Sequence, residues 1–280
     1  MGIDKHSLNL LRYVTENHGK LGRVITLGRQ AIHLGPRASR KWIESGSDGY
    51  CESLLTGSFG AIHVDSIDNS DYEGATIVAD MNLAIPESIR ELYDTVIDLG
   101  CTEHIYDVVQ SLRNVASLCK PGGTILHAVP ANGFCGHGFY QFSPELFFSR
   151  YSKSNGFTDT EIFLAELCDI HHWYRVSPPQ DGKRINVRSP DELYVLVITR
   201  RIAHVSDNVQ QSDYEFTWEE QSGQQRPTHA QGRLAWAREI LDANRLTARL
   251  VNRVDAWLAP NGVKQLRSHP ALQRVTVAMP

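Results

Sequence analysis

The chain has 280 residues, of which 41% are hydrophobic, and its 28 basic and 32 acidic side chains give a net charge of −4. This length supports one large domain, or one domain with an appendage. The acidic balance gives no electrostatic reason to expect a nucleic-acid or membrane partner. No apolar run approaches about 18 residues, and the first residues lack the apolar core of a signal peptide, so we expect a cytoplasmic protein.

The cysteines and histidines show no metal-binding spacing. The five cysteines are odd in number and lack a CxxC pair, so neither a disulfide framework nor a zinc site is expected. His171 and His172 are neighbours, and neighbours on a strand point to opposite faces. The sequence therefore predicts no metal site. The cysteines are Cys51, Cys101, Cys119, Cys135 and Cys168.

The first third of the chain alternates helical and strand patterns. Residues 7–19 have helical spacing and end at a glycine, and an apolar strand follows at residues 24–27. A second short helix is compatible with residues 39–47. Residues 59–68 and 75–80 then form strand candidates that each end in an acid.

The middle of the chain continues the alternation. Residues 93–100 form another strand candidate, and residues 102–120 keep one apolar face until Pro121-Gly122-Gly123 ends the helix. A buried strand follows at residues 123–130. Strands that alternate with helices predict a parallel α/β sheet, in which ligands bind outside the carboxyl ends of the strands.

Glycines and acids stand at these predicted strand ends: Gly28, Asp68, Asp80 and Gly100. An acid in such a place can accept both hydroxyls of a ribose. A later acid, or the amides beside it, can face an adenine.

Three stretches resemble class I S-adenosylmethionine-dependent methyltransferases. "YDTVIDLGCTEHIYDVVQSLRNVASLCKPGGTILHAVP" is similar to the fourth strand, following helix and fifth strand, and "SIDNSDYEGATIVADMN" to the second and third strands of a subgroup with a reduced helix. "NGFCGHGFYQFSPELFFSRYSKSNGF" resembles the substrate-facing region of bacterial small-molecule members. The resemblance spans roughly residues 20–202. It implies a Rossmann-like class I methyltransferase sheet with helices on both faces, and S-adenosylmethionine as cofactor.

The loop after the first strand departs from the family pattern. Where the family resembles GxGxG, only Gly28 matches, and Arg29 and Gln30 bring bulk. Two explanations are possible. In the first, the side chain of Arg29 or Gln30 reaches the carboxylate of the cofactor; in the second, the cofactor site has been lost and the fold serves another purpose. We favour the first explanation, because Asp68, Asp80 and the "GCTEH" loop are retained.

The resemblance implies a set of cofactor-binding residues, each with a structural alternative. Asp68 could instead cap a local turn, and Asp80 could belong to a plain loop. Glu103 could simply stand at the start of a helix, where the helix dipole alone favours an acid. The implied cofactor-binding residues are Gly28, Arg29, Gln30, Asp68, Asp80, Met81, Gly100 and Glu103.

Methyl transfer needs a base only when the acceptor carries a proton that must leave. His137, between two glycines in the loop after the fifth strand, is the first candidate base, and His104 is the second. Tyr140 and Gln141 are candidates to orient substrate, although aromatics here are also compatible with core packing. A helix is expected from Pro144, with its cap at residue 143.

Beyond residue 155 we expect the last two strands at residues 158–167 and 192–202. The predicted domains are a Rossmann-like methyltransferase domain at residues 1–202, a linker at 203–231 and a helical C-terminal extension at 232–280. A solvated basic face is the default interpretation of the long C-terminal helix. Packing of this helix in a homodimer is the alternative.

Three functions are compatible with these features. The favoured one is methyl transfer to a small-molecule acceptor, by O- or N-methylation of a specialised metabolite or glycan. The second is a non-catalytic or repurposed protein of the same fold, suggested by the degenerate glycine loop. The third, a nucleic-acid or protein methyltransferase, is disfavoured by the acidic balance and the absence of an NPPY-like tetrapeptide.

Overall fold

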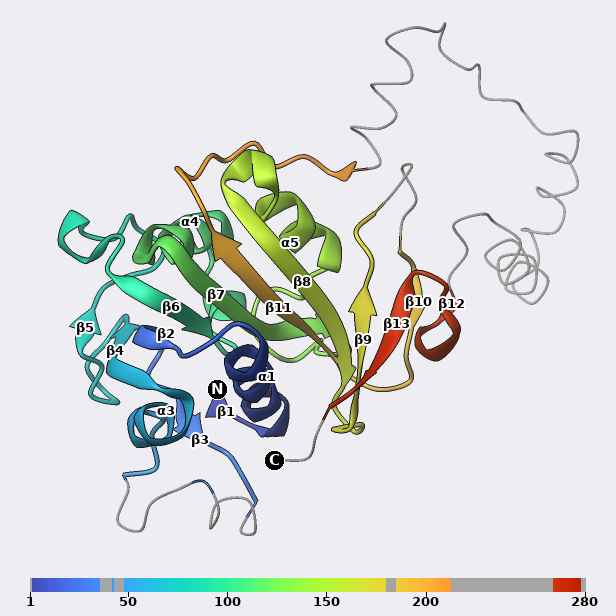
Figure 1. Cartoon of the computed structure of the whole chain (residues 1–280), viewed down its shortest axis with the longest axis horizontal. Helices are drawn as coiled ribbons and strands as arrows, with labels where there is room; N and C mark the ends of the chain where they lie inside the picture. The colour runs from blue at the N-terminus through green and yellow to red at the C-terminus, as the bar shows by residue number, and fades with distance from the viewer. Residues whose placement is uncertain (1, 36–41, 43–47, 180–184, 213–263, 278–280) are drawn as a thin grey trace, which may run out of the picture.

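A computed structural model describes residues 2–35, 42, 48–179, 185–212 and 264–277. Its centre is a nine-stranded mixed sheet in the order β13-β9-β8-β11-β7-β6-β2-β4-β5 (Figure 1). These strands are β2 (Gly22–Leu27), β4 (Ala61–Asp68), β5 (Ile77–Val78), β6 (Tyr93–Asp98), β7 (Cys119–Asn132), β8 (Phe157–Glu166), β9 (His172–Val176), β11 (Leu193–Arg201) and β13 (Leu272–Thr276). Two short parallel pairs join β1 (Gly2–Ile3) to β3 (Ala31–Ile32) and β10 (Val187–Arg188) to β12 (Lys264–Gln265).

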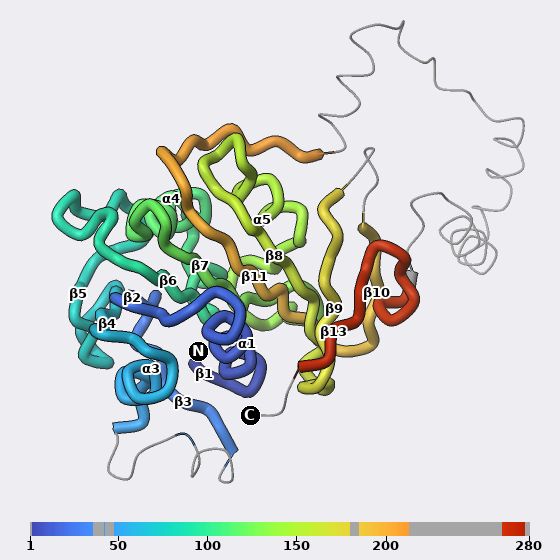
Figure 2. The backbone as a smooth tube through the Cα atoms, in the orientation of Figure 1, coloured from blue at the N-terminus to red at the C-terminus, as the bar shows by residue number. Residues whose placement is uncertain are grey.

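The half of the sheet from β5 to β7 is parallel, as the sequence predicted. The antiparallel strand β11 lies between β7 and β8. After β2 the chain moves to β4 on one side and later returns to β6 on the other. Such a reversal is a topological switch point, where open α/β sheets bind ligands. The chain traces in Figures 1 and 2 show β5 and β13 at opposite sides of the molecule.

Helices cover both faces of the sheet, as expected. Successive strand residues belong to two different buried clusters, one on each face of the sheet. Val24 is in the cluster with α1 (Lys5–Asn17) and α3 (Glu52–Phe59), whereas Ile25 is in the cluster with α4 (Val108–Leu118) and α5 (Pro144–Arg150). This alternation follows from the two-residue repeat of a strand. Helix α1 begins where the Asp4 carboxylate accepts a hydrogen bond from the Ser7 amide at 2.7 Å.

Two predicted boundaries were wrong. The helix expected at residues 102–120 starts only at Val108, where the Asp107 side chain caps it by accepting from the Gln110 amide at 2.9 Å. Residues 102–104 form a separate 3₁₀ turn. The helix ends at Leu118, and the Pro-Gly-Gly stretch is already part of β7. Helix α3 was not predicted, and the short helix expected at residues 39–47 lies mostly outside the described residues.

The end of the chain differs from the expected helical extension. Residues 213–263, which hold most of the predicted linker and the long helix, lie outside the described residues. Residues 264–277 form β12, a 3₁₀ turn and β13, and β13 pairs with β9 along five residues. The strands at residues 158–167 and 192–202 are therefore not the last ones. The open edge of β9 offers unpaired backbone groups, and β13 satisfies them.

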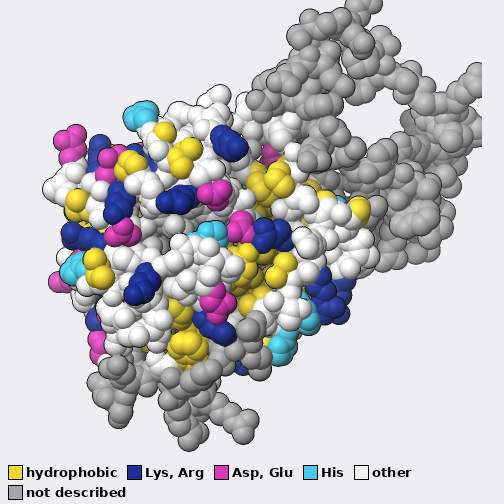
Figure 3. All heavy atoms as spheres, in the orientation of Figure 1, with side chains coloured by type: hydrophobic (Ala, Val, Ile, Leu, Met, Phe, Trp, Pro, Cys, Tyr) yellow, Lys and Arg dark blue, Asp and Glu magenta, His cyan; other side chains and the backbone are white. Residues whose placement is uncertain are grey.

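None of the described helices is both long and apolar enough to cross a membrane. Basic and acidic side chains are interspersed over the described part of the face in Figure 3.

Candidate functional site

The turn after β2 brings three predicted residues together. Gly28 has a φ of +70°, which favours glycine, and its amide donates to the Ile67 carbonyl of β4 at 2.8 Å. A Cβ placed on Gly28 would lie 3.6 Å from both Asp68 Oδ2 and Gln30 Nε2. Gly28, Gln30 and Asp68 therefore line one side of the switch point between β2 and β6. We call Gly28, Gln30, Asp68 and Gly100 the strand-end site.

The Asp68 carboxylate is unused within the described part of the chain. Its backbone carbonyl accepts from the Ala79 amide at 2.8 Å, but its side chain has no hydrogen bond or ion pair there. The local turn cap that was the alternative is therefore not formed among these residues. Burial, together with the nearby charges of Asp98 and Asp68, raises the pKa of the Cys101 thiol. Asp68 therefore lies near Cys101, in the loop that follows β6.

Arg29 points to acidic side chains of its own chain. Its guanidinium contacts Glu52 and Asp48 at 2.6 Å each, donates to the Glu73 carbonyl at 3.0 Å and lies 4.0 Å from the centre of the Tyr50 ring. All three of its nitrogens have partners. The hydrogen bond from Arg29 to Glu52 is the main cause of the raised pKa of this guanidinium.

Gln30 turns inward. Its side chain is 1% exposed, and its Nε2 donates to the Leu27 carbonyl. Its Oε1 is buried with no hydrogen-bond partner among the described residues. Of the two bulky residues in this loop, Gln30 is therefore the one that keeps an unused polar atom beside Gly28 and Asp68.

Asp80 and Met81 have local structural contacts. Asp80 Oδ1 accepts from the backbone and side-chain nitrogens of Asn82, both at 2.8 Å, and these bonds lower the pKa of the exposed carboxyl. Met81 is 5% exposed and packs in the core, and its carbonyl accepts from Asn114 Nδ2 at 3.1 Å. These contacts match the plain-loop alternative, and cofactor binding by either residue stays a prediction.

The loop after β6 is held by a buried acid that the sequence analysis missed. Asp98 Oδ1 accepts from the amides of Cys101 and Thr102 at 2.9 and 3.3 Å. Gly100, with a φ of +88°, makes the intervening turn. Burial of Asp98 disfavours its charge, but its contacts with His127 outweigh that effect and lower its pKa. Asp98 is thus a positioning residue for the loop that carries Glu103.

Asp98 belongs to a fully buried chain of hydrogen-bonding groups. His127 Nδ1 lies 2.8 Å from Asp98 Oδ2, and His127 Nε2 lies 2.7 Å from the Tyr151 hydroxyl. Asp98 and His127 sit opposite each other on the parallel strands β6 and β7. The sequence held one signal for this pair: an acid near the end of one predicted strand and a histidine within the next.

Glu103, His104 and His137 form a second group, which we call the Glu-His cluster. Glu103 is 1% exposed, and its Oε1 lies 3.4 Å from His137 Nε2 and 3.9 Å from His104 Nε2. The two imidazole rings meet edge to face with their centres 4.8 Å apart. Burial, and then the charge of Asp98, raises the pKa of Glu103 to about 8. Burial and the neighbouring His137 lower the pKa of His104. The structure thus brings together both predicted bases.

The loop that carries His137 is fastened to the loop that carries Glu103. The Phe139 amide donates to the Glu103 carbonyl at 2.7 Å, and the Tyr140 hydroxyl donates to the Tyr106 carbonyl at 2.7 Å. Gln141 Oε1 accepts from the Phe134 amide at 2.9 Å and closes the loop on itself. Tyr140 and Gln141 therefore shape this loop. Their contact with a substrate stays a prediction.

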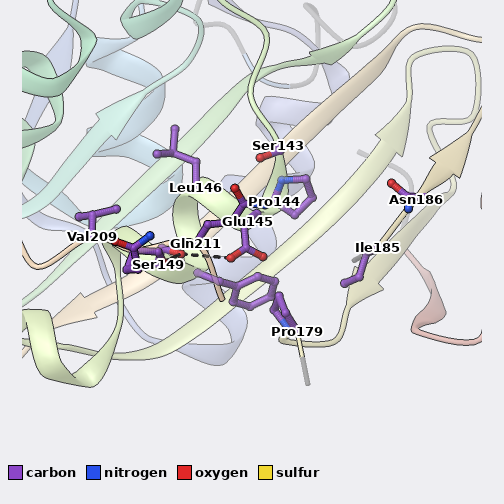
Figure 4. A pocket seen from close by; sticks show the side chains of 12 residues that line it. Ser143, Pro144, Glu145, Leu146, Ser149, Pro179, Ile185, Asn186, Val209 and Gln211 are labelled. Carbon is purple, nitrogen blue, oxygen red and sulfur yellow. Dashed lines mark hydrogen bonds between the residues drawn. The ribbon is translucent and has the colours of Figure 1, made fainter. Parts of the chain in front are cut away.

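A separate hollow of about 390 Å³ lies beside the start of α5 (Figure 4). Its only ionisable side chain among the described lining residues is Glu145, whose Oε1 accepts from the Ser149 hydroxyl and the Ser212 amide. It shares no residue with the strand-end site or the Glu-His cluster. We place the chemistry at the strand ends, because the unused carboxylates lie there.

No family model and no curated protein matches this sequence. Among solved structures, the chain is similar to the 1,6-didemethyltoxoflavin N1-methyltransferase of Burkholderia thailandensis, with 10% identity, a TM-score of 0.41 and coverage of 71% of this chain and 79% of that one. It is also similar to the N-methyltransferase NodS of Bradyrhizobium japonicum, with 14% identity, a TM-score of 0.41 and coverage of 71% and 95%. At these values the likeness carries no argument about function. The description of this chain as an α/β fold with a parallel core from β5 to β7 rests on its own strand order.

Proposed function

We propose that this chain is an S-adenosylmethionine-dependent methyltransferase that acts on a small-molecule acceptor. The observation that carries the proposal is the unused Asp68 carboxylate, which stands at the end of β4 beside the left-handed turn of Gly28. A carboxylate at the switch point of a parallel sheet can accept both hydroxyls of a ribose.

The other residues of the strand-end site fit the same cofactor. Gly28 lets a ligand approach the backbone closely, because it has no side chain. The unpaired Oε1 of Gln30 is an acceptor, so it suits the ammonium group of the methionine part and not its carboxylate. This assignment revises the expectation that Arg29 or Gln30 reaches the carboxylate, since the nitrogens of Arg29 already have partners. When bound, the cofactor supplies an activated methyl group on its sulfonium.

The Glu-His cluster is suited to the acceptor. His137 and His104 are about half exposed and lie over a buried carboxylate, so either imidazole can receive the proton of a hydroxyl or amine acceptor. The exposed rings of Tyr106 and Phe139 meet edge to face beside the cluster, with centres 6.0 Å apart. Such rings suit the apolar part of a small molecule.

Calorimetric titration with S-adenosylmethionine and S-adenosylhomocysteine tests the cofactor assignment. We expect one site per chain, and we expect Asp68→Asn to weaken binding by about 1–3 kcal/mol, the scale of lost charge-assisted hydrogen bonds. Asp71→Asn, an exposed acid in the loop after β4, is the control and should bind normally. Unchanged affinity in a folded Asp68→Asn variant would remove Asp68 from the site.

One observation favours the second candidate, a non-catalytic protein of the same fold. The loop after β2 is tied to Asp48 and Glu52 through Arg29, which is what a repurposed structural loop would show. Absence of binding heat with both nucleosides in the unmodified chain would favour this candidate over the enzyme.

A further inference from the structure

We propose that Glu103, His104 and His137 bind a divalent transition-metal ion. Each residue offers one ligand atom, and the three atoms lie within 4.8 Å of one another. Two imidazoles and one carboxylate form a donor set that suits zinc and related ions, whereas magnesium prefers oxygen ligands alone. The inference deepens the proposed function, because the same loops would hold the acceptor.

The spacing of the ligand atoms is close to that of a metal site. Metal–ligand bonds of 2.0–2.1 Å in a tetrahedral site place neighbouring ligand atoms about 3.3 Å apart. Glu103 Oε1 is 3.4 Å from His137 Nε2 and 3.9 Å from His104 Nε2. All three ligand atoms lie within 4.8 Å of one another, so rotations of the two partly exposed imidazoles would bring them to this spacing.

The state of Glu103 is the independent observation that points to a cation. Its side chain is 99% buried, and neither carboxylate oxygen has a hydrogen-bond partner in the described part of the chain. The ion-pair contacts found for it there are those with His104 and His137. The neighbouring acid Asp98 is already paired with His127. A buried carboxyl group without hydrogen-bond partners is costly, and a metal ion shared with both imidazoles would compensate this cost.

The backbone around the cluster holds the ligands in place before a metal arrives. Asp98 fixes the start of the turn that carries Glu103, and the Phe139 amide binds the Glu103 carbonyl, which joins the two ligand-bearing loops. Gly138, with a φ of +66°, passes so close that a Cβ would lie 2.8 Å from the Glu103 carbonyl oxygen. Three protein ligands leave at least one coordination position open, as in catalytic zinc sites. An acceptor oxygen bound there would lose its proton more readily. Because both histidines would then be ligands and not bases, that proton would pass to solvent water.

Zinc titration of the untagged, chelator-treated chain tests the proposal without any cofactor. We expect one Zn²⁺ per chain, a clear preference over Mg²⁺, and intense visible absorption when Co²⁺ replaces zinc in a tetrahedral site. Glu103→Gln, His104→Ala and His137→Ala should each weaken zinc binding more than about tenfold. His63→Ala is the matched control, because His63 is also exposed and lies 3.0 Å from a carboxylate, that of Asp65.

The outcomes separate the metal from the cofactor. Zinc binding that is lost in the three cluster variants and kept in His63→Ala supports the site, provided that circular dichroism shows each variant folded. No stoichiometric binding, or binding that the cluster variants leave unchanged, overturns it. A chain that binds zinc at the cluster but no S-adenosylhomocysteine would keep this inference and refute the proposed function. A chain that binds S-adenosylhomocysteine but no zinc at the cluster would refute this inference and keep the proposed function.

Discussion

Gly28→Ala tests whether a ligand passes close to the turn after β2. In the folded chain the φ of Gly28 is +70°, a region that costs an alanine about 1–2 kcal/mol. The added methyl group meets Asp68 and Gln30 at 3.6 Å, which is ordinary contact, so no clash adds to this cost. We therefore expect the free energy of unfolding to fall by only about 1–2 kcal/mol, measured by urea denaturation.

Gly28→Ala should also weaken cofactor binding, and by more than the strain of the backbone at this position explains. If the methionine part of the cofactor lies against Gly28, the methyl group intrudes on it, and the cost is on the scale of overpacking, about 1–3 kcal/mol. The affinity for S-adenosylhomocysteine, measured by calorimetry, should then fall about five- to 150-fold. Gly122→Ala is the matched control: its φ is +84° and its Cβ would meet no atom within 4 Å. It should lose similar stability and keep its affinity. Equal affinity in both variants would refute the close approach at Gly28.

Three further predictions concern activity and stability. His137→Ala should lower turnover about 10²-fold or more in a methyl-transfer assay and leave the affinity for S-adenosylhomocysteine unchanged; parallel loss of both would show that the residue shapes the loop instead. Burial raises the pKa of Glu161, but contacts with His18 and Arg175 outweigh burial and lower this pKa. The ionised Glu161 therefore stabilises the fold fully above its unfolded pKa of about 4.3, and this stabilisation is lost as the pH falls through the folded pKa. Glu161→Gln should therefore flatten the loss of stability below about pH 4.3, followed by urea midpoints at several pH values, and an unchanged slope there would contradict this. Asp98→Asn removes a fully buried carboxylate that contacts His127 and two backbone amides, and should cost about 1–3 kcal/mol in urea denaturation; a loss below about 0.5 kcal/mol would show that these contacts do not stabilise the fold.

The parallel core could be predicted from the sequence because its signals are local. Apolar runs such as residues 24–27 and 93–98 have the length and composition of buried strands, and acids or glycines mark where they end. Strand β13 was missed because it is short and only partly buried, with Gln273 and Arg274 exposed. Among the described residues, its strand partner is the open edge of β9, which lies about a hundred residues earlier.

The candidate site was only partly predictable for a similar reason. Strand ends could be found along the chain, and the structure places Gly28 and Asp68 side by side at one edge of the sheet. Their binding of a cofactor stays a prediction. The direction of a side chain depends on distant partners: Arg29 turns to Asp48 and Glu52, and Met81 turns into the core under α4. Glu103 was expected at the start of a helix, where the helix dipole alone favours an acid. The 3₁₀ turn fixed by Asp98 buries it instead.

Hydrogen–deuterium exchange with and without S-adenosylhomocysteine tests the central claim, that the strand ends of β2, β4 and β6 bind the cofactor. We predict slower amide exchange in peptides that cover residues 26–32, 66–70 and 98–104 when the ligand is present, and unchanged exchange in β9 and β13. Protection confined to the hollow beside α5, or no protection anywhere at saturating ligand, would contradict the account.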